Sequence, residues 1–435
     1  MPFSPCAALL GLRLPLRQLV RATTWLGVAG LLWAAPAYAQ LGGSRLGLPS
    51  LPNVPSLPRV PVQETLDTAR SAVPLQQLRL TTVRELLRKH PDLLEVDPAG
   101  ELVRRRELVL LSPTPAAVEA ALALGFVRLR EQMLPELDLH QVVLRPPGNM
   151  PTARALTVLR DLQPQVEVDF NHIYTASGDA GTGGATTSPL TIGPMRVGLI
   201  DSGVDAQHPA LQRTELHHWG CQGAPVPGVH GTAVASLLVG HDRAGQPGSV
   251  VLYTADIYCG QPAGGSAEDV ASALAWMARE RVAVINISLV GPTNRLLERS
   301  VQAMVRKGHL VVAAVGNDGP AAPPLYPASY AGVVGVTGVA SSQRALPEAA
   351  QGPQVMFAAP GVYASAAQMG GGNRSVRGTS FAAPRVAALL ARQMPYPDVA
   401  AAQVAMARLT AVAVDLGEPG RDPVYGWGLV GADKP

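Results

Sequence analysis

Three polar residues of this chain, far apart in the sequence, are of the types needed for nucleophilic catalysis. They are Asp201 in Asp-Ser-Gly, His230 in His-Gly-Thr and Ser380 in Gly-Thr-Ser. A serine hydroxyl attacks a carbonyl carbon when a neighbouring base takes its proton. His230 is the candidate base, and the carboxylate of Asp201 would fix the ring tautomer and stabilise the imidazolium that forms. These residues predict an acyl-transfer site with a covalent intermediate on Ser380.

The elements that must position these residues are short apolar runs alternating with helical patterns. The strand-like runs are 196–200, 250–257, 282–287, 310–314 and 333–336, and the helical patterns are 232–239, 267–279, 296–307 and 381–392. Such alternation predicts an α/β fold, with a parallel sheet covered by helices on both faces. Active sites in such sheets lie at the carboxyl ends of the strands. Asp201 directly follows one of these runs, as the prediction requires.

The strings around the three residues resemble the subtilisin-like serine proteases (peptidase S8). The strings are RVGLIDSGVDAQHPAL, HGTAVASLLVG and RGTSFAAPRVAALLA, and their order Asp, His, Ser is the order of that family. The resemblance runs from about Arg196 to the C-terminus. It implies a subtilisin-like fold, a serine endopeptidase activity on polypeptide substrates, and no cofactor.

The same resemblance assigns an oxyanion-stabilising role to Asn317. This residue lies in Gly-Asn-Asp-Gly after the apolar run LVVAAV, where the family places an asparagine. Its amide and the backbone N–H of Ser380, in the first turn of a helix, would together bind the developing negative charge. The alternative is that Asn317 only shapes a turn, which Asn-Asp-Gly favours.

The resemblance also assigns residues to substrate binding. Ser288, Leu289, Val290 and Gly291 match the segment that lines the pocket for the residue before the scissile bond, where an extended peptide would pair with an edge strand. Many members have Ser-Leu-Gly-Gly here, and Leu325 stands where glycine is common at the pocket floor. Because Val290 and Leu325 both add bulk, we predict a preference for small residues such as alanine.

The N-terminus has the features of a signal peptide. Three arginines between residues 13 and 21 precede an apolar stretch over 25–35, and Ala-Tyr-Ala at 37–39 fits a signal peptidase site. The alternative is a membrane anchor, but the apolar stretch is shorter than the about 20 residues that span a bilayer. We predict a signal peptide over 1–39 and a secreted or periplasmic protein, free of the membrane once the signal is removed.

Four further segments follow the predicted signal peptide. A proline-rich linker covers 40–76, a propeptide-like domain 77–176, a flexible Gly/Ser/Thr-rich processing linker 177–194, and the catalytic domain 195–435. The propeptide-like domain begins with a helical pattern over 78–95. Its core, about 107–174, has strand patterns at 107–111, 127–133, 137–144 and 166–173, and helical patterns at 115–124 and 152–162.

This strand-helix-strand-strand-helix-strand order predicts a ferredoxin-like core. Subtilisin-like enzymes commonly carry a propeptide of this shape, which assists folding and then blocks the cleft as an intramolecular inhibitor. Self-cleavage is expected near residues 174–178. The alternative is an unrelated small α+β domain.

Cys221 and Cys259 are the cysteines that remain after removal of the signal peptide with Cys6. In an oxidising compartment they are candidates for one disulfide. It would close a loop of about 38 residues around His230 and stabilise the fold by about 3 to 4 kcal/mol. The alternative is two buried free thiols.

No metal site and no nucleic-acid partner are expected. The histidines that suggest zinc lack a recognised ligand spacing; they are His208, His217, His218 and His241. The stretch after His230, where several family members bind calcium, has only Asp242 as an acidic residue. The net charge of +3 is spread along the 435 residues and forms no basic stripe.

Two other functions compete with proteolysis. A catalytically inactive subtilisin-fold binding or chaperone module would be expected to lose at least one of the four proposed catalytic residues, and all four are present. A lipase or esterase would usually carry Gly-x-Ser-x-Gly, which does not occur in the chain.

Overall fold

The computed structural model of the protein describes residues 79–180, 195–240 and 250–432. The predicted signal peptide, the proline-rich linker and most of the processing linker lie outside these residues. All described residues belong to one compact unit, Val60–Pro435. Every helix in the described ranges is too short or too polar to span a bilayer.

An antiparallel sheet forms the N-terminal part of the described chain. Its elements are β1 (Leu94–Val96), β2 (Leu102–Leu111), α2 (Pro115–Ala123), β3 (Val127–Leu134), η1 (Pro135–Leu137), β4 (Leu139–Arg145), α3 (Thr152–Leu162) and β5 (Glu167–Ala176). The strands lie in the order β5-β2-β4-β3, and every neighbouring pair is antiparallel. This is the ferredoxin-like order that the sequence pattern predicts.

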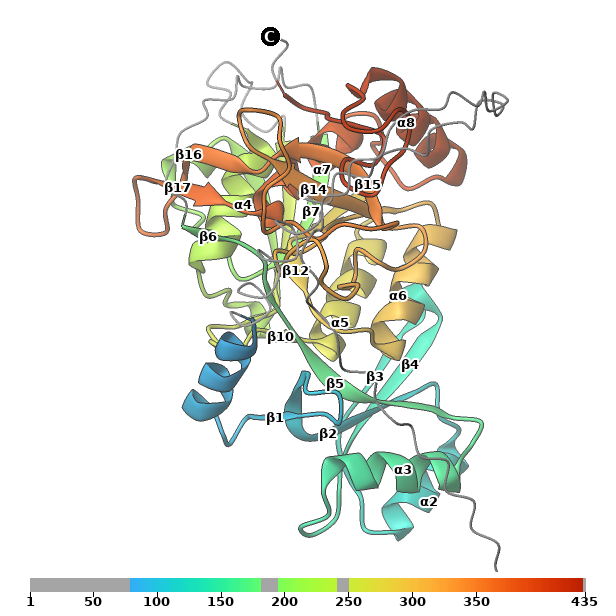
Figure 1. The fold of residues 1–435 in the computed structure, drawn as a ribbon. Coiled ribbons are helices and arrows are strands. Elements are labelled where there is room, and N and C mark those ends of the chain that lie inside the picture. Colours follow the sequence, from blue (N-terminus) through green and yellow to red (C-terminus); the bar gives the residue numbers. More distant parts are fainter. Residues whose placement is uncertain (1–78, 181–194, 241–249, 433–435) are drawn as a thin grey trace, which may run out of the picture. The chain divides into compact units, whose positions relative to one another are not determined.

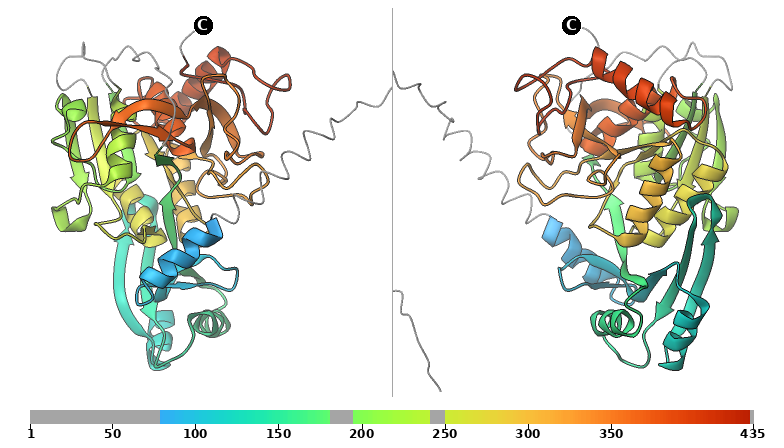
Figure 2. Two further views of the ribbon diagram at one scale, coloured as in Figure 1. Left: turned by 60° about the vertical axis from the view of Figure 1, so that its left-hand side comes forward. Right: turned by 90° about the vertical axis from the view of Figure 1, so that its right-hand side faces the viewer.

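The C-terminal part of strand β2, residues 108–111, is buried on both faces, which explains its run of apolar residues. Leu108 and Leu110 pack with α2 and α3, whereas Val109 and Leu111 belong to a second core that includes α5 (Ala267–Arg279) and α6 (Arg295–Arg306). Successive side chains of a strand point to opposite faces, so one face rests on the sheet's own helices. The other face packs on two helices of the C-terminal part (Figures 1 and 2).

The helical pattern predicted over 78–95 is wrong at its C-terminal end. The helix covers residues 79–89, and Leu94–Val96 instead form β1, which pairs with β2. Pro91 explains the difference, because the residue before a proline is disfavoured in the helical region of backbone angles.

A seven-stranded parallel sheet forms the C-terminal part. Its strands, in spatial order, are β15 (Val355–Pro360), β14 (Val334–Val339), β13 (Leu310–Ala314), β11 (Val284–Ile287), β7 (Met195–Asp201), β9 (Val250–Asp256) and β8 (Thr214–Trp219). All neighbouring pairs are parallel. The predicted parallel α/β sheet is confirmed.

Helices cover both faces of this sheet. On one face lie α4 (Val229–Val239), α7 (Thr379–Ala391) and α8 (Val399–Val412), which share a core with Val197 and Leu199. On the other face α5 and α6 share a core with Ile200 and Ile285. Short elements complete the described fold: η2 (Pro209–Leu211), η3 (Cys221–Gly223), β6 (Asp179–Ala180), β10 (Gly265–Ser266), β12 (Leu289–Val290), β16 (Val362–Ala367) and β17 (Asn373–Arg377).

Candidate active site

Asp201 and His230 are brought together at the carboxyl end of β7. Asp201 is the last residue of the strand and is fully buried, and His230 lies in the first turn of α4. The Nδ1 atom of His230 is 2.9 Å and 3.0 Å from the two carboxylate oxygens of Asp201. The backbone N–H of Ser202 donates to the same carboxylate at 2.7 Å. The carboxylate is therefore held in place to orient the imidazole.

Glycine at position 231 explains why a helix can begin so close to Asp201. Its N–H donates to the hydroxyl of Ser202 at 2.9 Å. A Cβ added at Gly231 would lie 2.1 Å from the carbonyl oxygen of Ser202, closer than atoms approach one another. The absent side chain lets the first turn of α4 rest on the loop after β7, which sets the position of His230.

Ser380 lies in the first turn of α7, fully buried, at the same end of the sheet. Phe381 is the next residue in the chain after Ser380, and the centroid of its ring lies 5.4 Å from that of the His230 ring. The hydroxyl of Ser380, however, donates to the carbonyl oxygen of Ser288 at 2.9 Å. Within the described part of the chain, Nε2 of His230 has no hydrogen-bond partner. The structure therefore joins Asp201 to His230 but does not join His230 to Ser380.

The side chain of Asn317 faces the same place. Its Oδ1 accepts a hydrogen bond from the backbone N–H of Thr379 at 3.0 Å, which leaves Nδ2 as the end of the amide that can donate. A Cβ added at Gly378 would lie 2.7 Å from Nδ2 of Asn317, and the φ of Gly378 is +137°. Both the lack of space and the backbone conformation therefore favour glycine here. The geometry is compatible with a donor beside the N–H of Ser380.

The chain itself passes through this site as an extended strand. The end of β5 pairs antiparallel with β10 and β12, with Ile173 and Tyr174 opposite β10, and Thr175 and Ala176 opposite β12. Beyond the site, β6 pairs antiparallel with β17. Figure 1 shows β5 running from the antiparallel sheet to the parallel one. The end of β5 and the first residues of the predicted flexible linker are thus bound to the C-terminal part on either side of the place where Ser177 meets Ser380.

Ser177 is the residue of this strand that meets Ser380. The backbone N–H of Ser380 donates to the carbonyl oxygen of Ser177 at 3.1 Å. In return, the N–H of Ser177 donates to the hydroxyl of Ser380 at 3.1 Å and to the carbonyl oxygen of Ser288 at 3.5 Å. Self-cleavage was expected near residues 174–178, but the loop composition of this segment gave no sign of which residue would meet Ser380.

The predicted substrate-binding residues are divided between two places. Leu289 and Val290 form β12 against the bound strand, and Ser288 contacts Ser380 through both its carbonyl and its hydroxyl. Leu325 is buried against Gly316, where an added Cβ would lie 2.4 Å from its Cδ1. Leu325 therefore lies against Gly316, the residue before Asn317, and its place at the pocket floor stays a prediction.

Tyr174 is a site residue that sequence reasoning missed. Its side chain is fully buried, and its hydroxyl donates to the carbonyl oxygen of Pro292 at 2.8 Å. Burial raises the pKa of Tyr174 well above its ordinary value. A Cβ added at Gly291 would lie 2.6 Å from the tyrosine ring, so Gly291 gives room for it. The bound strand is thus anchored by an aromatic side chain as well as by its backbone.

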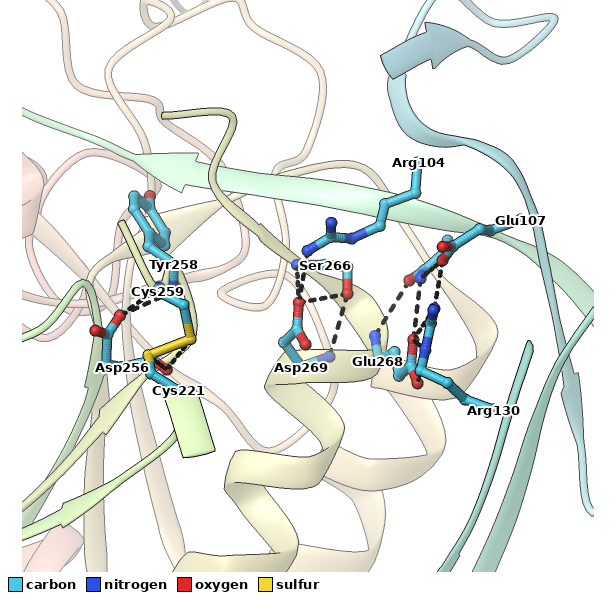
Figure 3. Close-up of polar contacts among 11 residues, drawn as sticks. Arg104, Glu107, Arg130, Cys221, Asp256, Tyr258, Cys259, Ser266, Glu268 and Asp269 are labelled. Atoms are coloured by element: carbon cyan, nitrogen blue, oxygen red, sulfur yellow. Dashed lines mark hydrogen bonds and ion pairs between the residues drawn. A yellow bond between two sulfur atoms is a disulfide. The ribbon is translucent and has the colours of Figure 1, made fainter. Parts of the chain in front are cut away.

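The structure joins Cys221 and Cys259 by a disulfide, with Cα atoms 5.1 Å apart. Asp256 lies beside the disulfide (Figure 3) and accepts hydrogen bonds from the backbone N–H groups of Val226, Tyr258 and Cys259. The two sulfur atoms and Asp256 are the only group of potential metal ligands among the described residues, and the sulfurs are bonded to each other.

The described histidines of the rejected zinc hypothesis have separate partners. His208 hydrogen-bonds the carbonyl oxygen of Gly372, His217 contacts Glu215, and His218 contacts Thr254. His241 lies outside the described residues.

Comparison with known families decides what kind of site this is. The profile of the subtilase family, peptidase S8, matches residues 194–428, more than half of the chain. The chain belongs to the subtilase family. Its parallel sheet has the subtilisin-like fold, and the protein is a serine endopeptidase of the subtilisin type.

Individual subtilases show how far the similarity extends. The chain is 30% identical to Subtilisin DY of Bacillus licheniformis over 256 residues, which cover 55% of this chain and 89% of that protein. It is 32% identical to the minor extracellular protease Epr of Bacillus subtilis over 46% of this chain and 32% of that protein. The crystal structure of fervidolysin from Fervidobacterium pennivorans, at 18% identity, has the same fold, with a TM-score of 0.64 over 78% of this chain and 61% of that one.

Proposed function

We propose that the chain is an exported zymogen in which Ser380, with His230 and Asp201, cleaves peptide bonds through an acyl-enzyme. Residues 77–176 are its propeptide. One observation carries the proposal: the chain enters its own site as a substrate strand, and the carbonyl oxygen of Ser177 accepts the N–H of Ser380.

The chemistry follows from the positions of these groups. The hydroxyl of Ser380 turns from Ser288 towards the unpartnered Nε2 of His230 and gives up its proton as its oxygen bonds to the substrate carbonyl carbon. The N–H of Ser380 and the Nδ2 of Asn317 bind the resulting oxyanion. His230 then protonates the leaving amine, and a water molecule hydrolyses the ester by the same steps.

The bond that the zymogen cleaves first is Ser177–Gly178. Ser177 supplies the carbonyl oxygen at Ser380, and the chain is paired before this bond with β12 and after it with β17. A peptide held on both sides of a bond has that bond fixed for attack. Cleavage would leave Gly178 as the new N-terminus of the catalytic part.

The bound strand also indicates the preferred substrates. The residue before the bond is Ser177, a small residue, in agreement with the bulk of Leu325 and Val290. A Cβ added at Gly178 would lie 2.6 Å from the ring of Phe381, so glycine is favoured after the bond. With Tyr174 buried four positions before the bond, the proposed preference is for polypeptides with Tyr-x-x-Ser or Tyr-x-x-Ala before glycine.

Export is part of the same proposal. The predicted signal peptide over 1–39 supports secretion or a periplasmic location, and the relative Epr is an extracellular protease by name. The disulfide between Cys221 and Cys259 suits an oxidising compartment.

N-terminal sequencing of the purified protein, beside its Ser380→Ala variant, tests the proposal. We expect the active protein to begin at Gly178 and the variant to retain the segment before it. A fluorophosphonate probe should label the active protein and leave Ser380→Ala unlabelled. An unprocessed, unlabelled protein would instead support the inactive binding module.

A further inference from the structure

A helix that lies outside the ferredoxin-like core covers the bound strand. This helix, residues 79–89, and the β1 segment that follows it form what we call the strap, residues 79–102. Half-buried side chains of the helix, Val83, Leu86 and Leu87, pack on a small apolar cluster. The cluster consists of Leu94, Leu102, Ile173 and Ala263. It therefore joins the strap to the bound strand and to the loop that precedes β10.

The other end of the helix is tied to the catalytic part by charge. The guanidinium of Arg79 is 2.6 Å from a carboxylate oxygen of Asp318 and 2.8 Å from one of Glu101. Asp318 directly follows Asn317, so this ion pair connects the strap to the loop of the proposed oxyanion donor. The three side chains are 21% to 30% exposed, so solvent screens the pairs only in part.

The helix and the proposed scissile bond border the same hollow. A hollow of about 200 Å³ separates Arg79, Val83 and Leu86 from Ser177 and Asn317. The helix thus covers the hollow, and it is attached through the Arg79 ion pair and through the apolar contacts of Val83, Leu86 and Leu87. Because the hollow limits the packing of this helix against the bound strand, loss of either attachment should loosen the strap.

We propose that the strap is a second inhibitory anchor, which holds the cleaved propeptide in the cleft and delays the appearance of activity. This inference rests on the proposed self-cleavage at Ser177–Gly178. Hydrolysis removes the covalent link there but leaves the backbone pairing of β5 with β10 and β12, and the strap adds contacts that must also break. Changes at such contacts act mainly on the dissociation rate.

Arg79 allows a clean test, because it leaves with the propeptide and the mature enzyme is unchanged by its substitution. Full-length wild type, Arg79→Gln and the matched control Arg84→Gln, at an exposed arginine of the same helix, are compared over time. Gel electrophoresis follows cleavage, and fluorophosphonate labelling of Ser380 follows opening of the site. We expect equal cleavage rates, and an interval between cleavage and labelling that is about three- to tenfold shorter in Arg79→Gln only.

Leu86→Ala tests the apolar end of the strap in the same way and should also shorten the interval. If Arg79→Gln fails to be cleaved, the result with Leu86→Ala decides. The strap inference is overturned if Arg79→Gln or Leu86→Ala is cleaved normally and its interval between cleavage and labelling equals that of Arg84→Gln. Wild type that is cleaved and labelled with no interval also overturns it, whereas wild type that is neither cleaved nor labelled overturns the proposed function itself.

Discussion

The hydroxyl oxygen of Ser177 lies 2.8 Å from the hydroxyl oxygen of Ser380. Together with the N–H of Ser177, this contact keeps the Ser380 hydroxyl on the side of Ser288 and away from His230. The residue at the proposed cleavage site thus restrains the hydroxyl group that is proposed to attack it.

Ser177→Ala should therefore speed up self-cleavage. The methyl group still fits the small pocket, but one hydrogen bond that holds Ser380 in its turned-away orientation is lost. One such bond contributes about 0.5 to 1.5 kcal/mol, which corresponds to about a two- to tenfold faster cleavage. Pulse-chase electrophoresis measures the rate, and slower cleavage than wild type would show that the contact assists the reaction.

Ser177→Phe should slow self-cleavage by about 5- to 150-fold, because a large side chain has to be forced into a filled site at a cost of about 1 to 3 kcal/mol. The buried Leu325 is the side chain that we expect to obstruct it. Adding Leu325→Gly should restore much of the rate. The idea is contradicted if the double variant is cleaved as slowly as Ser177→Phe alone.

Asn317→Ala should lower kcat with little change in KM, since the amide acts on charge that develops in the transition state. For the equivalent donor in subtilisin itself the known loss is about 10²- to 10³-fold. Steady-state kinetics on a peptide substrate measure both constants, and a thermal unfolding scan controls for misfolding. An unchanged kcat would leave Asn317 only the role of shaping its turn.

Release of the propeptide should become faster as the pH rises. Burial raises the pKa of Glu268 at the start of α5, even though Arg130 of the proposed propeptide donates to it at 2.7 and 2.8 Å and lowers that pKa in part (Figure 3). Glu107 shares the same guanidinium, and Asn171 and Asp269 are the other polar neighbours. A carboxyl group whose pKa is raised in the complex favours binding below its ordinary pKa, and this contribution is lost as the pH rises through the raised value.

Glu268→Gln should flatten that dependence, because the amide stays uncharged at every pH. Dissociation is followed by labelling of Ser380 in protein that has already been cleaved, from pH 5 to about pH 9. A profile in the variant as steep as that of wild type would assign the pH dependence to other groups.

Replacing Cys221 and Cys259 by serine should lower the free energy of unfolding of the mature enzyme by about 3 to 4 kcal/mol, as expected for a loop of this length. The disulfide ties η3 to the loop after β9. Denaturant unfolding with and without reductant measures the effect, and the double variant should no longer respond to reductant.

The main sheet was predictable because its inner strands are apolar on both faces and alternate with helices. The run 310–314, for example, is β13, and the pattern 267–279 is α5, as predicted. Strand β8 was missed because Thr214–Trp219 is an edge strand of mostly polar residues and has no apolar run. Strands of two residues, such as β6 and β10, are defined by their partners and have no pattern of their own.

The residues of the proposed site were predictable from their motifs, but their relationships were not. Ser177 is bound to residues more than a hundred positions further along the chain, and such a pairing leaves no local trace in a segment rich in glycine, serine and threonine. The rotamer of Ser380 likewise depends on contacts with Ser177 and Ser288, and the sequence does not show that these residues meet. Motifs fix which groups are present, whereas distant contacts fix how each is turned.

Strand β2 packs with one face against its own helices and with the other against α5 and α6. This double packing bears on whether the proposed activation can be reversed. Once the two pieces separate, Val109 and Leu111 become exposed to water, and the detached fragment loses the apolar contacts of that face of its sheet. A partly unfolded polypeptide is a good substrate for the protease that it inhibited. Destruction of the fragment would make activation irreversible.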